Sequence, residues 1–351
     1  MGKDGLLLVR VPFSLAGEMA KNPTVADRFN IVTLDISYLD QFRMQGGFAA
    51  CYAHGQDPAL RAELENLVRR IVVEHKVTHA VVLTPLFWYS EAVAQVLDGA
   101  GVKRIWSEVF LGGKLIFDRL GCQYTHVNEI NEFADSLPTM IPDLPTVTRF
   151  RQPELVLPKV LRAKYGVEGG QAMAVLGQVP SDNALKDTTG GLSYYEWLDA
   201  IFRQNPDTKF LFKHHPVIKM NPRGATEGLE KYPNVRVVDE SIWSLFLAFD
   251  AFASYNSTAI LEGLIQRKRF MTGGFHFMSH PGLCLRATAP EDAVSAYERV
   301  TSLSLDQSVC ERRISFVTRR YTLLPSDHRM ADRILLPSAE FYGLPVAAER
   351  V

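Results

Sequence analysis

The sequence predicts an α/β protein with two domains, each built on a parallel sheet. Strand-like and helix-like segments alternate in the first half of the chain, and the alternation starts again in the second half. Between the halves, residues 131–158 are rich in proline and aspartate and show no clean hydrophobic period. Alternating strands and helices are typical of βαβ units with parallel strands. The length of 351 residues also fits two domains.

The first half contains a clear amphipathic helix among short apolar strands. Apolar residues recur at helical spacing from Pro58 to His75, which predicts a helix with one buried face. A second helix is predicted over Glu91–Leu97. The predicted strands are Leu6–Val11, Asn30–Leu34, Ala80–Leu83 and Lys103–Trp106.

The second half begins with a predicted linker helix, Leu155–Tyr165, which Gly166 closes. The predicted strands that follow are Ala172–Leu176, Lys209–Phe212, Val235–Val238, Ala251–Ser254 and Arg269–Thr272. The predicted helices are Tyr194–Arg203, Ile242–Ala248, Thr258–Gln266 and Glu291–Leu303. A last helix is predicted from about Gln307 to Tyr321, before a tail punctuated by proline.

Two Rossmann-like halves with parallel sheets that face an interdomain cleft form the GT-B arrangement, which other two-domain α/β folds share. We expect an N-terminal domain over residues 1–160 and a C-terminal domain over residues 161–322. The tail, residues 323–351, is expected to pack back on the first domain.

Composition excludes several classes of function. The net charge of −1 gives no global electrostatic case for binding nucleic acid or membrane. The apolar run Leu6–Val9 is too short for a membrane span and lacks the form of a signal peptide. The four cysteines form no CxxC pair, so we expect reduced thiols in a cytoplasmic protein and no thiolate zinc site.

Polar residues follow three predicted strands of the second half, where parallel strands present their carboxyl ends to a ligand crevice. Gln178 and Asp182 follow the first of these strands. Asp182 is interpreted either as a reactive carboxylate or as a helix cap or turn residue. Lys213, His215 and Pro216 follow the second strand. Proline there fixes the loop, so that His215 can donate to a phosphate, although a histidine at the surface fits as well.

The third segment, Asn256, Ser257 and Thr258, is predicted to begin a helix. A helix N-terminus is also an anion site, so a capping role and a binding role are compatible. Glu262 lies one turn further on and either accepts hydrogen bonds from sugar hydroxyls or is an ordinary surface residue. In the first half, Glu108 follows a predicted strand, where an apolar loop would raise its pKa and suit it to act as a base.

Several nucleotide and metal motifs are absent from the sequence. It contains no Asp-x-Asp, no GxxxxGK[ST] and no GxGxxG. We therefore expect no metal and no cofactor.

The order of the motifs resembles that of the retaining β-Kdo glycosyltransferases of bacterial capsule and O-antigen assembly, where Kdo is 3-deoxy-D-manno-oct-2-ulosonic acid. The resemblance covers about Lys103 to Leu283. The motifs are Trp106–Gly113, Asp118–Tyr124, Gln178-x-x-x-Asp182, Lys213-x-His215-Pro216, and Ser257-x-x-x-x-Glu262 with Gly274-x-x-Phe277. The chain departs from the family at Val109, where Asp-Gly often follows the glutamate, and at His214, where threonine is usual.

This resemblance implies a donor, CMP-β-Kdo, and a double displacement. Asp182 would attack the anomeric carbon to form a covalent Kdo–enzyme intermediate, and Glu108 would deprotonate the acceptor hydroxyl. Lys213, His215, Ser257 and Thr258 would neutralise the phosphate of CMP. The residue that binds the carboxylate of Kdo stays open among Lys186, Lys219, Arg223 and Arg286.

The acceptor that the resemblance implies is a lipid-linked glycan at the inner face of the cytoplasmic membrane. Arg312, Arg313, Arg319 and Arg320 would form a basic patch for peripheral docking, or simply a solvated helix face. Two alternatives stay open. One is another GT-B enzyme, an inverting transferase or a sugar-nucleotide epimerase. The other is a non-catalytic sugar-nucleotide-binding subunit.

Overall fold

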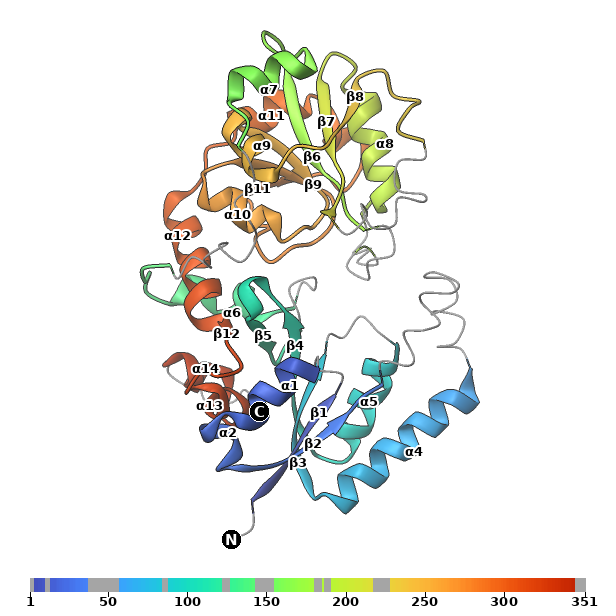
Figure 1. Cartoon of the computed structure of the whole chain (residues 1–351), viewed down its shortest axis with the longest axis vertical. Coiled ribbons are helices and arrows are strands. Elements are labelled where there is room, and N and C mark those ends of the chain that lie inside the picture. The colour runs from blue at the N-terminus through green and yellow to red at the C-terminus, as the bar shows by residue number, and fades with distance from the viewer. Residues whose placement is uncertain are drawn as a thin grey trace. The chain divides into compact units, whose positions relative to one another are not determined.

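The computed structural model describes residues 3–9, 13–36, 57–83, 88–121, 127–142, 155–179, 185, 191–216 and 228–344. The chain divides into two compact units, with residues 1–145 and 315–351 in unit 1 and residues 146–314 in unit 2 (Figure 1). The sequence analysis predicted these boundaries after residues 160 and 322. The second boundary lies inside the helix α12, Gln307–Phe316, where no break in the sequence marks it.

Unit 1 contains a six-stranded sheet with the order β12-β5-β4-β3-β1-β2. β1 to β4 pair in parallel, as predicted, whereas β5 and β12 extend the sheet by antiparallel pairing. The strands are β1 (Asp4–Val9), β2 (Phe29–Leu34), β3 (Val77–Leu83), β4 (Lys103–Val109), β5 (Leu115–Asp118) and β12 (Thr322–Leu323).

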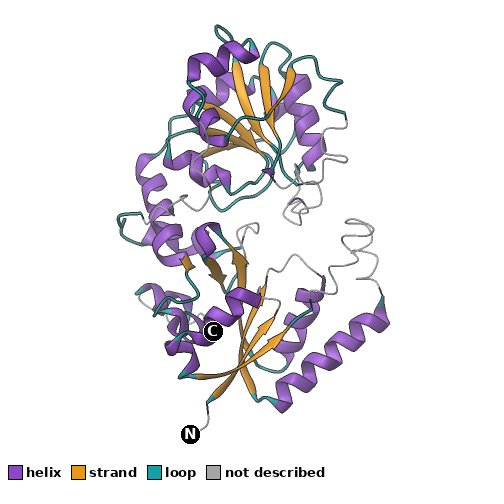
Figure 2. Ribbon diagram, viewed as in Figure 1, coloured by secondary structure: helices purple, strands orange, loops and turns teal. Residues whose placement is uncertain are grey.

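Helices cover both faces of the unit 1 sheet (Figure 2). Leu7 of β1 packs with α4 and α5, while the alternate residues Leu6 and Leu8 pack with α1 and α13. The helices are α1 (Phe13–Lys21), α2 (Pro23–Ala26), α4 (Pro58–Glu74), α5 (Trp88–Gly99), α6 (Glu129–Phe133), α13 (Met330–Leu335) and α14 (Ser338–Tyr342), with short 3₁₀ turns at η2 (Leu111–Gly113) and η3 (Ala134–Ser136).

The strand predicted to end at Trp106 continues to Val109 because a hairpin follows it. Residues 106–109 of β4 pair with residues 115–118 of β5. The turn between them places Gly112 and Gly113 at φ values of 70° and 75°, which glycine adopts without strain. A glycine pair between two apolar runs is a hairpin signal that the sequence analysis did not use.

Unit 2 contains a second six-stranded sheet, with the order β11-β10-β9-β6-β7-β8 and parallel pairing throughout. Four of the five predicted strands have the predicted bounds, and the fifth is one residue longer. The strands are β6 (Ala172–Leu176), β7 (Lys209–Lys213), β8 (Val235–Val238), β9 (Ala251–Ser254), β10 (Arg269–Thr272) and the unpredicted β11 (Cys284–Arg286).

The helices of unit 2 follow the prediction except near its end. The helix predicted over Glu291–Leu303 is divided, because Ser295 adopts a left-handed conformation with φ 51° between two helical segments. Beyond α12, the predicted last helix continues into unit 1 as a π-helical turn, η8 (Val317–Tyr321). The helices are α7 (Pro158–Tyr165), α8 (Tyr194–Gln204), α9 (Ile242–Ala248), α10 (Ala259–Ile265), η7 (Pro290–Ala293) and α11 (Ala296–Ser302).

Two further expectations concern the described residues. Cys284 and Cys310 are buried free thiols, whereas Cys51 and Cys122 lie outside the described residues. No helix in the described part of the chain is both long enough and apolar enough to cross a bilayer.

Candidate functional site

The strand order of unit 2 reverses at β6, the first strand of the unit. β6 pairs with β7 on one side and with β9 on the other, so the chain builds the sheet outward in both directions from it. In open α/β sheets, ligands bind at the carboxyl ends of the strands at this switch point. The three predicted polar segments follow the carboxyl ends of β6, β7 and β9.

Gln178 and Asn256 join two of these segments across the switch point. Both side chains are buried, and Nε2 of Gln178 donates to Oδ1 of Asn256 at 2.5 Å. The backbone N–H of Gln178 also donates to the hydroxyl of Tyr194, at 3.0 Å. The two predicted binding residues therefore fix the loops after β6 and β9 to each other.

A glycine after β10 allows this arrangement. A Cβ on Gly274 would lie 2.6 Å from the ring of Tyr255 and 3.2 Å from Nδ2 of Asn256. The first of these distances is a clash, so only glycine fits beside the loop after β9. The glycine of the Gly274-x-x-Phe277 motif thus supports the Asn256 loop by close packing.

The segment after β7 carries two histidines in different surroundings. Lys213 is the last residue of β7, and its carbonyl accepts a hydrogen bond from Gly177 at 2.8 Å. His215 is half-buried and Pro216 is exposed. The segment is thus anchored at the strand end that neighbours the Gln178 loop.

His214 was noted only as a departure from the family, yet the structure marks it as unusual. Its ring packs edge-on against Phe212, with centroids 5.1 Å apart, and its buried Nε2 has no hydrogen-bond partner among the described residues. Burial and the charge of Lys213 lower the pKa of His214, so the ring is neutral at pH 7. A buried polar nitrogen without a partner is uncommon and is available to a bound ligand.

The third segment begins α10 one residue later than predicted. Oγ of Ser257 accepts the backbone N–H of Ala259 at 3.3 Å, and the carbonyls of Ser257 and Thr258 accept the next two backbone N–H groups. Ser257 and Thr258 are half-buried beside Asn256.

Glu262, in the first turn of α10, is a carboxylate without a partner among the described residues. It is partly buried, and no described residue donates a hydrogen bond or forms an ion pair with it. Burial raises the pKa of Glu262 to about 7. A carboxylate kept from water in this way gains from any donor that a ligand brings.

Asp182 lies outside the described residues, as do Lys186, Lys219 and Arg223. Of the four basic residues considered for a sugar carboxylate, the structure describes Arg286 alone. Arg286 ends β11, and its guanidinium lies 5.9 Å from the ring centroid of Phe275.

Glu108 belongs to unit 1 and lies within β4, not after it as the sequence analysis expected. It pairs with Ile116 across the hairpin and is half-buried. Its Oε1 accepts the backbone N–H of Val109 at 3.0 Å. The extension of β4 by the hairpin explains the difference.

The Asp118–Gly121 part of the second motif has a structural role that the sequence did not reveal. Asp118 is fully buried and accepts the backbone N–H groups of Leu120, Gly121 and Glu129 and the hydroxyl of Tyr321. Nη2 of Arg119 donates to the carbonyls of Ile334 and Leu336, at 2.6 and 2.9 Å. This motif binds the C-terminal segment to the sheet of unit 1.

Glu129 completes that attachment. It forms a fully buried ion pair with Arg333 and accepts hydrogen bonds from the hydroxyls of Ser338 and Tyr342. Burial alone would raise the pKa of Glu129, but Arg333 and these hydrogen bonds outweigh burial and hold the pKa below its ordinary value. The long sequence separation of the partners hid this cluster from the sequence analysis.

One of the four arginines considered for a basic patch does not reach the surface. Arg313 is buried and donates to the carbonyl of Phe277 at 3.1 Å. Arg312 and Arg313 belong to unit 2, whereas Arg319 and Arg320 belong to unit 1 and bond the carbonyls of Ile141 and Tyr342. The expectation is wrong for Arg313, which the helix turns inward, and it stays untested for the other three arginines.

Comparisons with known proteins agree with the motifs of unit 2. Residues 159–307 match the family described as Capsule polysaccharide biosynthesis protein. This match confirms the resemblance to proteins of capsule assembly, and it contains all the predicted site residues except Glu108. No curated protein matches the chain by sequence.

Solved structures extend the similarity to the fold of both units. The β-Kdo 2,4-transferase of KpsC from Thermosulfurimonas dismutans has 15% identity and a TM-score of 0.55, with 92% of each chain covered. The β-Kdo 2,7-transferase of the same KpsC has 14% identity and a TM-score of 0.47, with 91% of this chain and 92% of that chain covered. A glycosyltransferase from Rickettsia africae has 11% identity and a TM-score of 0.42, with 97% and 99% covered. The predicted GT-B fold is confirmed.

Proposed function

We propose that this chain is a retaining β-Kdo glycosyltransferase that transfers Kdo from CMP-β-Kdo to a glycan acceptor. The observation that carries the proposal is the set of ligand-binding groups at the switch point of unit 2. There, a carboxylate and a histidine nitrogen without described partners accompany loops that are fixed to each other. The capsule family match over the same residues and the shared fold of the KpsC β-Kdo 2,4-transferase support the choice of sugar.

In this proposal, unit 2 binds the nucleotide. Glu262 accepts hydrogen bonds from the ribose hydroxyls, which supply the donors that no described residue provides. Lys213 and His215, with the hydroxyls and backbone of Ser257 and Thr258, neutralise the phosphate of CMP as it leaves. Gln178 and Asn256 hold the loops in position, and Pro216 stiffens the loop that carries His215.

Asp182 is the proposed nucleophile. Its carboxylate forms a bond to the anomeric carbon of Kdo while the bond from that carbon to the phosphate oxygen of CMP breaks. In the second step, Glu108 takes the proton of the acceptor hydroxyl, whose oxygen attacks the same carbon and displaces Asp182. Two inversions retain the configuration. CMP leaves as a stable anion, so the reaction needs neither a metal nor a cofactor.

We propose a lipid-linked glycan as the acceptor, reached at the inner face of the cytoplasmic membrane by peripheral association. The match to the family described as Capsule polysaccharide biosynthesis protein supports a glycan as the acceptor. Arg313 cannot contribute to such a contact, because it is buried.

Intact-protein mass spectrometry tests the proposal directly. The protein is incubated with CMP-Kdo, generated in place, without acceptor. We expect a mass increase of one Kdo residue that maps to Asp182 and is absent from Asp182→Asn. Glu108→Gln is the matched control, because it should form the adduct but transfer Kdo to an added acceptor at least about a hundredfold more slowly.

Each other result has a defined meaning. CMP binding without an adduct would favour an inverting enzyme or a binding subunit. An absence of both would reject the Kdo donor. An adduct that survives in Asp182→Asn would reject Asp182 as the nucleophile.

A further inference from the structure

Two neighbouring helices of unit 2 expose several large apolar side chains. Leu155, Leu157 and Val160, in α7 and the residues before it, are each more than half exposed. Leu247 of α9 is also more than half exposed, and Trp243, one turn earlier in α9, is partly exposed. Single exposed apolar side chains are normal, whereas a cluster of them marks an interaction surface.

The two helices lie against each other in unit 2 (Figure 1). The backbone N–H of Val156 donates to Oγ of Ser244 at 3.1 Å, and Nε of Arg162 donates to the carbonyl of Ala248 at 3.0 Å. These bonds join the two segments along their length. We call the surface formed by residues 155–164 and 242–248 the α7–α9 face.

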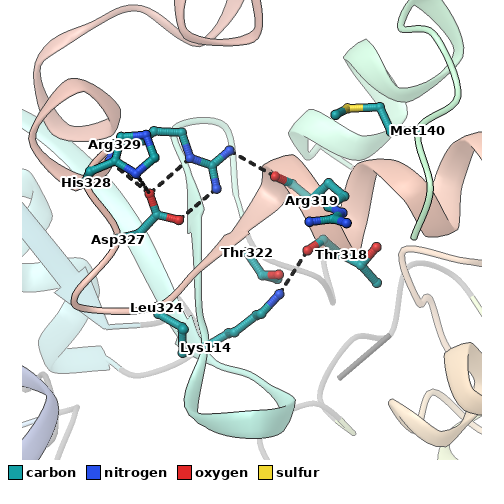
Figure 3. Close-up of a pocket in the computed structure, with 9 residues that line it drawn as sticks. All are labelled: Lys114, Met140, Thr318, Arg319, Thr322, Leu324, Asp327, His328 and Arg329. Carbon is teal, nitrogen blue, oxygen red and sulfur yellow. Dashed lines mark hydrogen bonds and ion pairs between the residues drawn. The ribbon is translucent and has the colours of Figure 1, made fainter. Parts of the chain in front are cut away.

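The α7–α9 face differs from the exposed apolar side chains around the pocket of unit 1. There, Met140 and Leu324 are less exposed and lie on opposite sides of the pocket, with Arg319 and Thr322 between them (Figure 3). Residues 155–158 and 242–248, by contrast, contain one polar residue, Ser244, and its hydroxyl accepts the N–H of residue 156. The apolar part of the α7–α9 face is therefore continuous in sequence on both helices.

The helix α7 is basic. It contains Lys159, Arg162 and Lys164 and no acid, and α9 contains no charged residue. Lys209 of β7 and Arg236 of β8 add two further cations, because each donates to a backbone carbonyl at the C-terminal end of α7. Five cations therefore belong to α7 or are bonded to it.

The acids near this face lie beyond the ends of α9. Glu240 pairs with Lys164 at 2.6 Å, and Asp250 pairs with Lys268 at 2.9 Å. Asp239 is the third of these acids. Cations therefore exceed acids around the face, and the apolar side chains lie beside positive charge.

An anionic bilayer fits this combination better than a second copy of the chain does. A two-fold dimer would place the same face on both sides of the contact, so the cations of α7 would meet those of the other copy. A bilayer offers acyl chains to the exposed leucines and valine and anionic headgroups to the lysines and arginines. Tryptophan, here Trp243, is typical of the boundary between the two.

The α7–α9 face also borders the edge of the sheet that holds the candidate site. α9 begins three residues after the end of β8, so its first turn, which contains Trp243, lies at the carboxyl edge of the sheet. A bilayer that contacts this turn is therefore adjacent to the edge at which the proposed donor binds.

We propose that unit 2 docks on an anionic lipid bilayer through the α7–α9 face. Leu157 and Val160 enter the headgroup region, and Lys159 contacts the lipid phosphates. The inference gives a location to the peripheral association in the proposed function, and it rests on that function only for the lipid-linked acceptor. The docking itself does not depend on it.

Co-sedimentation of the full chain with lipid vesicles, without donor or acceptor, tests the proposal. The vesicles contain phosphatidylethanolamine and phosphatidylglycerol, and neutral phosphatidylcholine vesicles are run in parallel. We expect the wild type to bind the anionic vesicles and Val160→Glu to bind them at least about tenfold more weakly, because an apolar contact is lost and a like charge is added. Lys159→Gln should weaken binding about fivefold on the anionic vesicles and leave it unchanged on the neutral ones.

Val73→Glu is the matched control. Val73 lies on α4 of unit 1, is 76% exposed and receives the same substitution. It should bind the anionic vesicles as the wild type does, with melting curves confirming that all the variants fold.

Three results would overturn the proposal. The first is an absence of binding of the wild type to the anionic vesicles. The second is an equal loss of binding in Val73→Glu and Val160→Glu. The third is a dimer, detected by light scattering, that Val160→Glu dissociates, because the face would then belong to a contact between two copies of the chain.

Failure here is distinguishable from failure of the proposed function. Vesicle binding is measured without substrates, whereas the Kdo adduct forms from a soluble donor without vesicles. Val160→Glu should therefore form the adduct as the wild type does. If both proposals hold, this variant should slow transfer to a lipid-linked acceptor in vesicles about tenfold and leave transfer to a soluble acceptor unchanged.

Discussion

Glu129 of unit 1 and Glu262 of unit 2 are both withdrawn from water, but the described residues supply hydrogen-bond donors only to the first. Glu129 contacts an arginine, two hydroxyls and a backbone N–H group. Glu262 has no partner among the described residues, and burial raises its pKa to about 7. A buried carboxylate with a full set of donors stabilises a fold, whereas one without donors is destabilising unless a ligand supplies them.

The two units therefore use buried charge for different purposes. In unit 1 it joins segments that are distant in sequence, and in unit 2 the proposed function assigns it to the nucleotide. The opposite directions of the two pKa shifts express the same difference.

We expect the largest loss of stability from breaking the ion pair between Glu129 and Arg333. Arg333→Met leaves Glu129 buried without its cation, and we expect the free energy of unfolding to fall by about 3–5 kcal/mol. Urea denaturation of the full chain measures the loss, and limited proteolysis should locate it in the C-terminal segment.

Arg28→Met is the control for this prediction. It removes an exposed arginine whose partner, Asp332, is the residue next to Arg333. Exposed pairs contribute less than about 1 kcal/mol. Equal losses in the two variants would show that the buried pair has no special role.

Removing the charge of Glu262 should raise the free energy of unfolding, whereas Arg333→Met should lower it. The folded-state pKa, about 7, is above the ordinary value of 4.5, so the ionised form is disfavoured in the fold. The contribution of this group to stability is present below pH 4.5 and is lost as the pH rises through 7. Glu262→Gln should therefore raise the free energy of unfolding by on the order of 2 kcal/mol at pH 8 and change it little at pH 4.

Chemical denaturation at the two pH values measures this difference. The exposed Glu291, changed to glutamine, is the control and should show no pH-dependent gain. Destabilisation by Glu262→Gln at pH 8 would mean that the carboxylate has a protein partner after all.

The pH dependence of CMP binding should also depend on the ionisation of Glu262. If ionised Glu262 accepts hydrogen bonds from the ribose hydroxyls, protonation of Glu262 below pH 7 competes with the binding of CMP. The affinity of wild type for CMP, relative to that of Glu262→Gln, should fall by up to about tenfold between pH 8 and pH 6. Calorimetric titration of both proteins isolates the effect, because protonation of CMP itself is common to both. Parallel pH profiles would remove Glu262 from the nucleotide site.

The smallest effect concerns the hairpin of unit 1, which has no counterpart in the parallel sheet of unit 2. Gly112→Ala places a Cβ at φ 70° and should cost about 1 kcal/mol. Gly17→Ala, in the helix α1 with open space around its Cβ position, should instead stabilise by a few tenths to 1 kcal/mol. Thermal melts compare the two, and equal signs would contradict the conformation of the turn.

The sequence predicted unit 2 better than unit 1, for a physical reason. Buried parallel strands such as Ala172–Leu176 are short apolar runs bounded by polar residues, and their limits are visible locally. β12 has two residues and exists only because β5 pairs with it, so no local pattern marks it. The antiparallel part of unit 1 thus escaped prediction.

The same division holds for the candidate site. The residues that follow β6, β7 and β9 were predicted to converge, because the carboxyl ends of parallel strands share one edge. The partners of Asp118 and Glu129 come from near the other end of the chain, and local sequence patterns do not predict contacts over such separations. The roles of Asp182 and Glu108 stay predictions.

The division of the chain also sets an order of assembly. Unit 2 is one continuous stretch, residues 146–314, while unit 1 takes residues from both sides of it. Glu129 and Arg333 are separated by 204 positions. At a synthesis rate of about 5–20 residues per second, Arg333 is synthesised roughly 10–40 s after Glu129. All of unit 2 is synthesised in that interval, so residues 146–314 can fold before the last segment of unit 1 exists.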